Sequence, residues 1–118
     1  MGDFNSTFLS GRIVSVPVAG KTKKGIDALS FKVRVTEDER DEATGKWVER
    51  ETVLECVAYG ALARMAASEL HAGDQIYIEG RNVVSTWEQE GNVRHRVQIQ
   101  VKRYSAEPAQ KRKAGRPA

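Results

Sequence analysis

The sequence of 118 residues has little of what a membrane or secreted protein needs, since it contains one cysteine and no long apolar run. A membrane-spanning helix requires roughly 20 consecutive apolar residues, so we expect no membrane association. The first residues, MGDFNSTFLSG, show no basic stretch followed by an apolar segment and are not expected to be a signal peptide. Cys56 cannot form an internal disulfide, is consistent with a reducing cytoplasm, and is expected to be a small buried strand residue.

Groups that could hold a metal ion or perform catalysis are also scarce. His71 and His95 stand far apart, and Cys56 has no companion at the spacing of metal ligands. A nuclease needs clustered carboxylates at a metal site, whereas the acidic residues of EDERDE (37–42) form a consecutive run that indicates a solvated surface. The sequence therefore predicts no enzyme activity, no metal or other cofactor, and no small-molecule substrate.

Net positive charge is concentrated near the C-terminal end. The chain carries a formal net charge of +3, but residues 102–118 alone contain six basic residues and one acidic residue. Residues 1–101 are therefore slightly acidic, with thirteen basic and fifteen acidic residues. A basic surface is the usual electrostatic signature of nucleic-acid binding, so the overall charge of this chain is weak support for such a function.

Alternation of apolar and polar residues is the dominant pattern. In ALSFKVRVT (28–36), the residues Leu29, Phe31, Val33 and Val35 share one face. Strands are predicted over 7–16, 28–36, 52–59, 75–87 and 93–101, with Phe8, Phe31, Val97, Ile99 and Val101 among the residues that point into the core. Apolar residues at helical spacing within 60–73 predict one helix of about three turns, with Gly73 as its C′ residue. Pro17 and residues 20–25 are predicted to form a loop, and residues 37–50 the tip of a long hairpin.

Five strands with one short helix between the third and fourth are the element order of an OB-fold. We therefore predict an all-β protein, a five-stranded Greek-key barrel, spanning residues 1–104. An SH3-like barrel is the alternative architecture, but such barrels usually lack a helix at this position. Gly11 and Gly80 interrupt long strands and are expected to be bulges or barrel corners. Residues 105–118 lack periodicity and are expected to form a disordered basic tail.

Several segments together resemble the bacterial single-stranded DNA-binding protein family. They are FLSGRI (8–13), the ATGK turn (43–46), VAYGALA (57–63), AASELHAGDQIYIEGR (66–81) and Trp87 before an acidic turn. The resemblance implies an OB-fold protein that coats single-stranded DNA without sequence preference and without catalysis. It also implies a homo-oligomer, with a homotetramer favoured, that acts in the cytoplasm, associated with the nucleoid, in DNA replication, recombination or repair. The sequence itself does not determine the oligomeric state, because interface strands look like any other strand face.

Three aromatic residues are candidates for stacking on bases. The resemblance places Tyr59 where the family usually has a stacking phenylalanine, and Trp87 on a stacking tryptophan of the hairpin between the fourth and fifth strands. Trp47 lies in the hairpin between the second and third strands and matches no usual stacking position. A ring folded over its own hairpin or a neighbouring subunit is therefore an equal alternative for Trp47. Tyr77 is expected to be a structural residue on a strand face.

Basic residues on the strands are candidates for contacts with DNA phosphates. Lys32 and Arg34 are favoured because they share an outward strand face. Lys21, Lys23 and Lys24 add charge in the first loop. The complete predicted set of nucleic-acid-binding residues is Arg12, Lys32, Arg34, Trp47, Tyr59, Arg81, Trp87, Arg94 and Arg96.

The chain also departs from the family pattern. The family commonly has further stacking tryptophans where this chain has Glu39 and Val53, and basic residues near Glu55, Val83 and Ser85. The acidic run 37–42 lies next to the expected path of a polyanion and repels it, although salt screens that repulsion beyond a Debye length of roughly 10 Å. We therefore expect DNA binding that is weaker, or differently routed, than is usual for the family.

The C-terminal residues KRKAGRPA differ from the acidic tip with a terminal phenylalanine that family members use to recruit partner enzymes. They form a generic basic tail or half of an AT-hook, a Gly-Arg-Pro segment that lies in the minor groove. An alternative function is an OB-fold accessory protein of a primosome or mobile element, used mainly for protein assembly and with weak DNA binding. RNA binding in the manner of cold-shock proteins fits the fold, but the interleaved aromatic motifs are missing.

Overall fold

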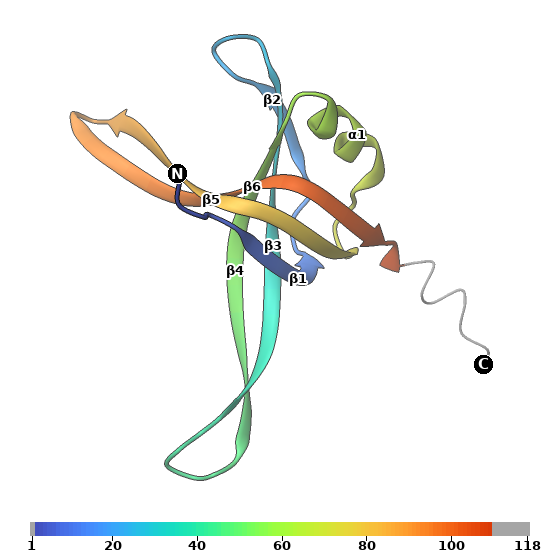
Figure 1. Cartoon of the computed structure of the whole chain (residues 1–118), viewed down its shortest axis with the longest axis vertical. Helices are drawn as coiled ribbons and strands as arrows, with labels where there is room; N and C mark the ends of the chain where they lie inside the picture. Colours follow the sequence, from blue (N-terminus) through green and yellow to red (C-terminus); the bar gives the residue numbers. More distant parts are fainter. Residues whose placement is uncertain (1, 110–118) are drawn as a thin grey trace.

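The computed structural model describes residues 2–109, which form six strands and one helix (Figure 1). Their bounds are β1 Thr7–Ile13, β2 Val18–Lys21, β3 Asp27–Arg40, β4 Trp47–Tyr59, α1 Ala61–Glu69, β5 Gln75–Gln89 and β6 Asn92–Glu107. No helix in this range is long and apolar enough to span a bilayer.

Five of the strands close into a barrel. They pair in the order β1–β5–β6–β4–β3, and β1 pairs with β3 to complete the ring. All of these pairs are antiparallel except β4 with β6, which run in parallel at Cys56–Ile99 and Val57–Gln100. The helix α1 follows β4 and packs against β3 and β4. The predicted OB-fold is therefore confirmed.

Two glycines allow the strands to approach one another closely. At Gly80 the β5–β6 register shifts, and a Cβ atom there would lie 2.3 Å from the backbone oxygen of Gln100. At Gly11, where β1 meets β3, a Cβ atom would lie 2.4 Å from the backbone oxygen of Arg34. Real Cβ contacts are never this short, so both positions require a residue without a side chain. The irregularity expected at Gly80 is confirmed, whereas Gly11 lies in a continuous β1–β5 ladder and marks a close approach to β3.

The core lies inside the barrel and under the helix. Its buried residues are Ile13, Leu29, Phe31, Val33, Cys56, Ala58, Ala63, Ala66, Leu70, Ile76, Ile78, Ile99 and Val101. The alternation in β3 is confirmed, since Leu29, Phe31 and Val33 are all buried. Cys56 is buried as expected, and burial raises the pKa of its thiol to about 12.

Two residues predicted for the core are exposed instead. Phe8 is 73% exposed on β1, and Val97 is 65% exposed on β6. Val97 pairs with Val84 in the part of the β5–β6 hairpin that projects from the barrel. A two-stranded hairpin has no second layer to cover its faces, so inward alternation there does not lead to burial. The prediction that Phe8 and Val97 belong to the core was wrong.

Several element boundaries differ from those predicted. The segment expected as a loop after Pro17 contains β2, which pairs with the start of β3. Residues 37–40, expected at a hairpin tip, belong to β3, because the β3–β4 ladder continues to the pair Arg40–Trp47. The helix ends at Glu69, so Gly73 belongs to the following turn, where it has a φ of 95°. β6 continues to Glu107, so residues 105–107 extend the strand, whereas residues 110–118 of the predicted tail lie outside the described residues.

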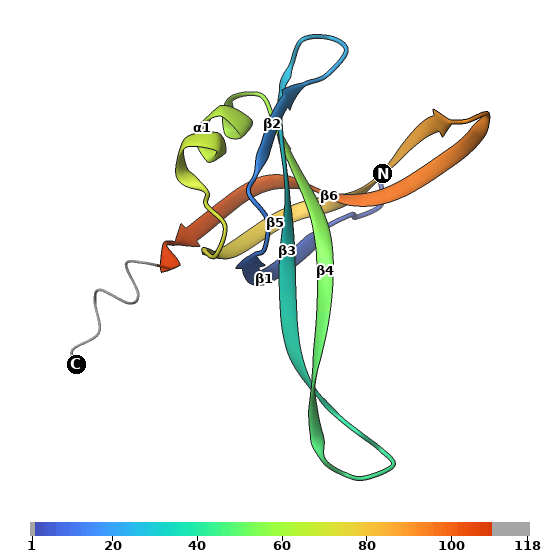
Figure 2. The same ribbon diagram turned by 180° about the vertical axis from the view of Figure 1, so that it is seen from behind.

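Two hairpins project from the barrel in different directions. The β3–β4 hairpin and the β5–β6 hairpin extend away from the closed part, as both Figure 1 and Figure 2 show. Backbone pairing extends to Arg40–Trp47 in the first hairpin and to Gln89–Asn92 in the second. The side chains on these hairpins are therefore held on regular strands and not on irregular loops.

Candidate nucleic-acid interface

The outer face of β3 and β4 carries four of the predicted residues. Directly opposed residues of an antiparallel pair share a face, and the register places Lys32 beside Glu55 and Arg34 beside Val53. Alternation along β4 puts Trp47 and Tyr59 on this same face. Trp47 is 71% exposed and Tyr59 is 38% exposed. The structure thus brings Lys32, Arg34, Trp47 and Tyr59 onto one face, spread along the length of the β3–β4 hairpin.

One face of the β5–β6 hairpin carries four more. Trp87 stands opposite Arg94, Ser85 opposite Arg96, and Arg81 opposite Gln100. These alternate positions share a face, on which the Ser85 hydroxyl also donates a hydrogen bond to Gln98 Oε1 at 2.8 Å. Trp87 is 37% exposed, so its ring is accessible in part.

The two faces meet at a small pocket with a volume of about 120 Å³. Lys32 of β3, Glu55 of β4, and Arg96 and Gln98 of β6 supply most of its polar lining. Ser15 and Ser30 add hydroxyl groups, and the buried Phe31 and Cys56 also line it. The pocket therefore joins the hairpin that presents Trp87 to the face that carries Lys32.

Arg96 is the residue that connects the two faces. Its guanidinium lies 4.9 Å from the centroid of the Trp87 ring, the geometry of a cation–π contact. Its Nη1 atom lies 3.2 Å from Glu55 Oε2. That buried oxygen makes no hydrogen bond, so the two groups have the separation of an ion pair without hydrogen-bond alignment. Sequence reasoning did not include Glu55 or Gln98 in the site, and only the pairing register places them there.

Two of the predicted basic residues are engaged in bonds of the barrel itself. Arg12 stands opposite Arg34, but its Nη1 donates a hydrogen bond at 2.7 Å to the backbone oxygen of Gly73. Arg81 donates a weaker bond at 3.4 Å to Gln100 Oε1. Arg12 therefore holds the turn before β5, and it lies apart from the pocket between the two faces.

Acidic side chains share the outer face of β3 and β4. Asp38 stands directly opposite Glu49, and Thr36 stands opposite Glu51, all on the face of Lys32 and Arg34. The opposite face carries Glu37 and Glu39, and Glu39 forms an ion pair with Arg50. The acidic run is therefore divided between two faces of the hairpin. Three carboxylates, those of Asp38, Glu49 and Glu51, separate Trp47 from the basic residues nearer the barrel.

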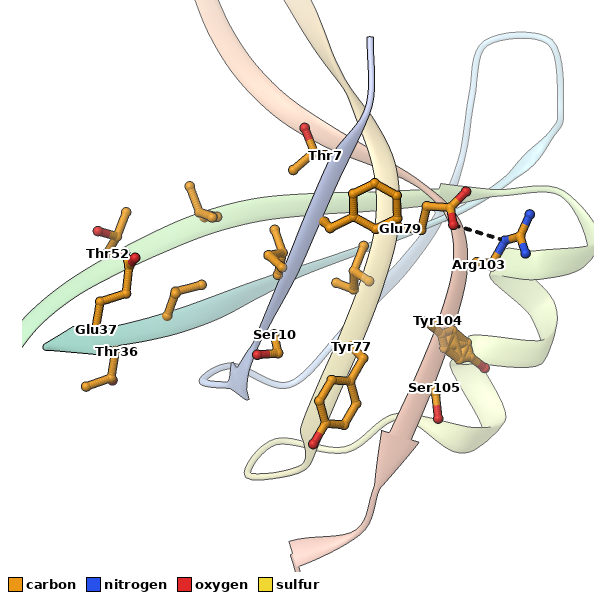
Figure 3. Close-up of a pocket in the computed structure, with 15 residues that line it drawn as sticks. Thr7, Ser10, Thr36, Glu37, Thr52, Tyr77, Glu79, Arg103, Tyr104 and Ser105 are labelled. Carbon is orange, nitrogen blue, oxygen red and sulfur yellow. Dashed lines mark ion pairs between the residues drawn. The ribbon is translucent and has the colours of Figure 1, made fainter. Parts of the chain in front are cut away.

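None of the nine predicted residues lines a second, larger concavity. It has a volume of about 870 Å³ and is lined by strands β1, β3, β4, β5 and β6 (Figure 3). Phe8, Leu9, Leu54 and Tyr77 supply apolar surface, and Glu79 pairs with Arg103 at 3.5 Å on its rim. Within residues 2–109, no group of three or more histidine, cysteine or acidic residues could hold a metal ion.

Comparison with known proteins agrees with this architecture. The chain matches the Single-strand binding protein family over residues 4–106. It is 30% identical over 99 residues to a single-stranded DNA-binding protein of Treponema pallidum (strain Nichols), covering 84% of this chain and 55% of that protein. The chain thus spans about half the length of that curated relative.

Two solved structures share the fold. The single-stranded DNA-binding protein of Thermus aquaticus, as a deletion mutant, superimposes with a TM-score of 0.79 at 24% identity, over 91% of this chain and 52% of that chain. A Plasmodium falciparum single-strand binding protein in complex with single-stranded DNA superimposes with a TM-score of 0.77 at 17% identity, over 90% and 95%. With the family matched over nearly all the described residues, this chain belongs to the single-strand binding protein family.

Proposed function

We propose that this protein binds single-stranded DNA without sequence preference. The observation that carries the proposal is that two exposed aromatic rings and unpaired basic side chains share connected faces of a barrel of this family. Trp87 and Tyr59 are the rings; Arg94 stands opposite Trp87, and Lys32 lies on the same face of β3 and β4 as Tyr59. Family membership indicates a binding protein and not an enzyme.

The chemistry of the site supports binding that is indifferent to sequence. Every base has a π-face, so stacking on Trp87 or Tyr59 does not depend on base identity and contributes about 1–3 kcal/mol for each stacked base. Lys32, Arg34 and Arg94 would contact phosphates, which releases counterions and makes binding weaken as salt rises. The carboxylates on the β3–β4 hairpin repel the same phosphates, so we expect binding weaker than that of a fully basic face.

A fluorescence titration tests the proposal. The Trp47→Phe variant leaves Trp87 as the single tryptophan, and this variant is titrated with poly-dT at two salt concentrations. We expect quenching of Trp87 emission, with an association constant that falls as salt rises. The absence of any quenching at low salt, together with unchanged anisotropy of a labelled oligo-dT, would show that the chain does not bind single-stranded DNA.

Substitution of the rings tests the stacking mechanism. Trp87→Ala and Tyr59→Ala should each weaken binding of labelled oligo-dT by about 1–3 kcal/mol, or roughly five- to 150-fold. Tyr77→Ala is the matched control, since Tyr77 is 48% exposed but lines the other concavity, and light scattering must show that this variant has the same mass of assembly as wild type. Trp47→Ala decides between base contact and a role in the hairpin. Equal affinities for Trp87→Ala, Tyr59→Ala and Tyr77→Ala would contradict stacking at these positions.

The apolar concavity supports self-association, and we favour a homotetramer. Phe8, Leu9, Leu54 and Tyr77 would be removed from water by a second copy of the chain, and contiguous apolar surface of this kind marks protein interfaces. Light scattering on the purified protein measures the mass of the assembly directly. A monomer at micromolar concentration would contradict self-association while leaving DNA binding as a separate question.

The process that such binding would serve is DNA replication, recombination or repair, in the cytoplasm and in association with the nucleoid, because these processes expose single strands. The acidic face of the hairpin and the apolar concavity favour a second candidate, an accessory protein for protein assembly with weak DNA binding. A stable oligomer that fails to bind oligo-dT at low salt would support this second function.

A further inference from the structure

Glu55 is an acidic residue at the centre of the candidate interface. Its carboxylate lies in the pocket between the two faces, beside Arg96 and on the face of Lys32. The Oε2 atom is buried and makes no hydrogen bond, although Arg96 Nη1 lies 3.2 Å away. A carboxylate in this position has two costs. It repels a polyanion that passes over it, and its buried oxygen lacks a hydrogen bond, which destabilises the folded protein.

Arg96 is distinguished from the other predicted basic residues by this contact. In the part of the chain that the structure describes, residues 2–109, Arg12, Lys32, Arg34, Arg81 and Arg94 form no ion pair, whereas Arg96 pairs with Glu55. The same guanidinium lies over the Trp87 ring. Glu55 therefore sets where Arg96 stands, and Arg96 in turn covers part of the aromatic surface offered to a base.

We propose that Glu55 is a built-in competitor of DNA phosphate for Arg96. In the free protein Glu55 holds the Arg96 guanidinium against Trp87. When single-stranded DNA binds, a phosphate replaces the carboxylate as the partner of Arg96, and the guanidinium leaves Glu55. This inference rests on the proposed function, and it gives Glu55 the role of a positioning residue that lowers the affinity of the site and its sensitivity to salt.

Loss of the Glu55 charge is expected to strengthen DNA binding. The pair is partly exposed, with 45% of the Arg96 side chain and 31% of the Glu55 side chain accessible, so it is weak enough to exchange with a phosphate. A guanidinium already neutralised by Glu55 gains less from a phosphate than a free one does. Removing the charge of Glu55 should therefore strengthen binding and add one phosphate contact to the salt dependence.

A double-mutant cycle tests the proposal on the full chain with labelled oligo-dT. Glu55→Gln keeps the size of the side chain and should raise affinity about two- to fivefold at low salt, as expected for one partly exposed ion pair. It should also steepen the slope of log K against log salt by about 0.7, the value for one further phosphate on a single strand. In the Arg96→Gln background the same Glu55→Gln change should leave the salt slope unchanged and raise affinity less, because only the repulsion between Glu55 and the phosphates is then removed.

The matched control is Glu79→Gln. Glu79 is also a strand residue in an ion pair, with Arg103 at 3.5 Å, and 30% of its side chain is accessible, but it lines the concavity away from the interface. Because Glu79 lies on the rim of the concavity proposed for self-association, light scattering must first show that Glu79→Gln has the same mass of assembly as wild type. Its loss of charge should then leave affinity and salt slope unchanged. An equal gain in the Glu79→Gln variant would show a general charge effect and would overturn the role of Glu55.

The outcomes separate this inference from the proposed function. Binding by the wild-type chain tests the function alone, whereas the ratio of Glu55→Gln to wild type tests the competition. If the wild type binds and Glu55→Gln binds equally or more weakly, the competition is refuted and the function stands. The competition is also refuted if Glu55→Gln strengthens binding equally in the Arg96→Gln background. If neither protein binds, both proposals fail. Glu55→Ala with an unchanged melting temperature serves as a second variant with the same expected gain.

Discussion

Single residues decide how closely the strands of this barrel can approach. Gly11 and Gly80 stand where one strand crosses the backbone of another, and a methyl group at either place would overlap a carbonyl oxygen. Neither glycine has the positive φ that is common for glycine in turns, since the positive-φ glycines are elsewhere. Their role is therefore to leave space, and a substitution should act through that space alone.

Gly80→Ala should destabilise the fold strongly. The added methyl group would lie 2.3 Å from the Gln100 backbone oxygen, so the β5–β6 ladder must shift, which costs about 1–3 kcal/mol or more. Urea denaturation followed by circular dichroism measures the loss in the free energy of unfolding. Gly20→Ala is the control, because a Cβ atom at Gly20 meets nothing within 4 Å. Equal stability of the two variants would contradict the steric explanation.

At the scale of elements, the hairpins β3–β4 and β5–β6 determine which charges face which surface. The β3–β4 hairpin places Lys32 and Arg34 on the same face as Asp38, Glu49 and Glu51. It places Glu37 and Glu39 on the opposite face. The net charge of the hairpin does not depend on how its charges are divided between the two faces, but a bound polyanion contacts only one face. The face on which each charged side chain lies, and not the total charge, should therefore control the electrostatic cost of binding DNA.

Removing two negative charges from the face of Lys32 and Arg34 should raise DNA affinity more than removing two from the opposite face of the β3–β4 hairpin. Asp38→Asn with Glu49→Gln should raise affinity for oligo-dT by about two- to tenfold at low salt, because like charges near phosphates repel them. It should also stabilise the hairpin, since Asp38 and Glu49 stand directly opposite each other. Glu37→Gln with Glu39→Gln makes the same change of charge on the opposite face. Equal gains in affinity for the two double variants would show that affinity does not depend on the face that carries the carboxylates.

At the scale of the whole molecule, a few polar contacts fasten the helix to the barrel and hold the turn before β5. Asp27, at the start of β3, accepts a hydrogen bond from Lys21 of β2 at 2.7 Å and one from Arg64 of α1 at 2.8 Å. Tyr104 of β6 donates a hydrogen bond to Glu69 of α1 at 2.5 Å. The buried Asp74 accepts a hydrogen bond from the backbone nitrogen of His71 at 3.0 Å. Burial, and then the Glu69 contact, raise the pKa of Tyr104 above its ordinary value.

Asp27 should make the stability of the molecule depend on acidic pH. Hydrogen bonds from Lys21 and Arg64 lower the pKa of Asp27 below its ordinary value of 3.8. The ionised carboxylate of Asp27 therefore stabilises the folded state. This contribution to the free energy of unfolding is complete above about pH 3.8 and is lost as pH falls through the lowered pKa of the folded state. Thermal melts between pH 2 and 7 should show a shallower acid loss for Asp27→Asn than for wild type. Asp3→Asn, on the exposed N-terminal segment, is the control, and a curve for Asp27→Asn that is parallel to wild type would refute this role.

Local patterns in the sequence predicted much of the fold but less of the site. The alternation in 28–36 predicted the buried face of β3, and Gly80 predicted the irregularity in β5, because both depend on neighbouring residues. Val97 failed because its burial depends on a second layer that the projecting hairpin lacks. The identities of Trp87 and Tyr59 as candidates came from the resemblance to the family, whereas Lys32 was chosen because it shares an outward strand face with Arg34. No local pattern indicates that Arg12 already donates a hydrogen bond to the backbone oxygen of Gly73.

The sequence by itself determined the class of fold, the family and the buried face of β3, because strand periodicity is a local property. Only the tertiary structure decided that Glu55, Arg96 and Trp87 meet. Glu55 lies on β4, whereas Trp87 and Arg96 lie on β5 and β6, and the parallel pairing of β4 with β6 brings them together. Register between distant strands depends on closure of the whole barrel, so contacts across it cannot be derived from either strand alone.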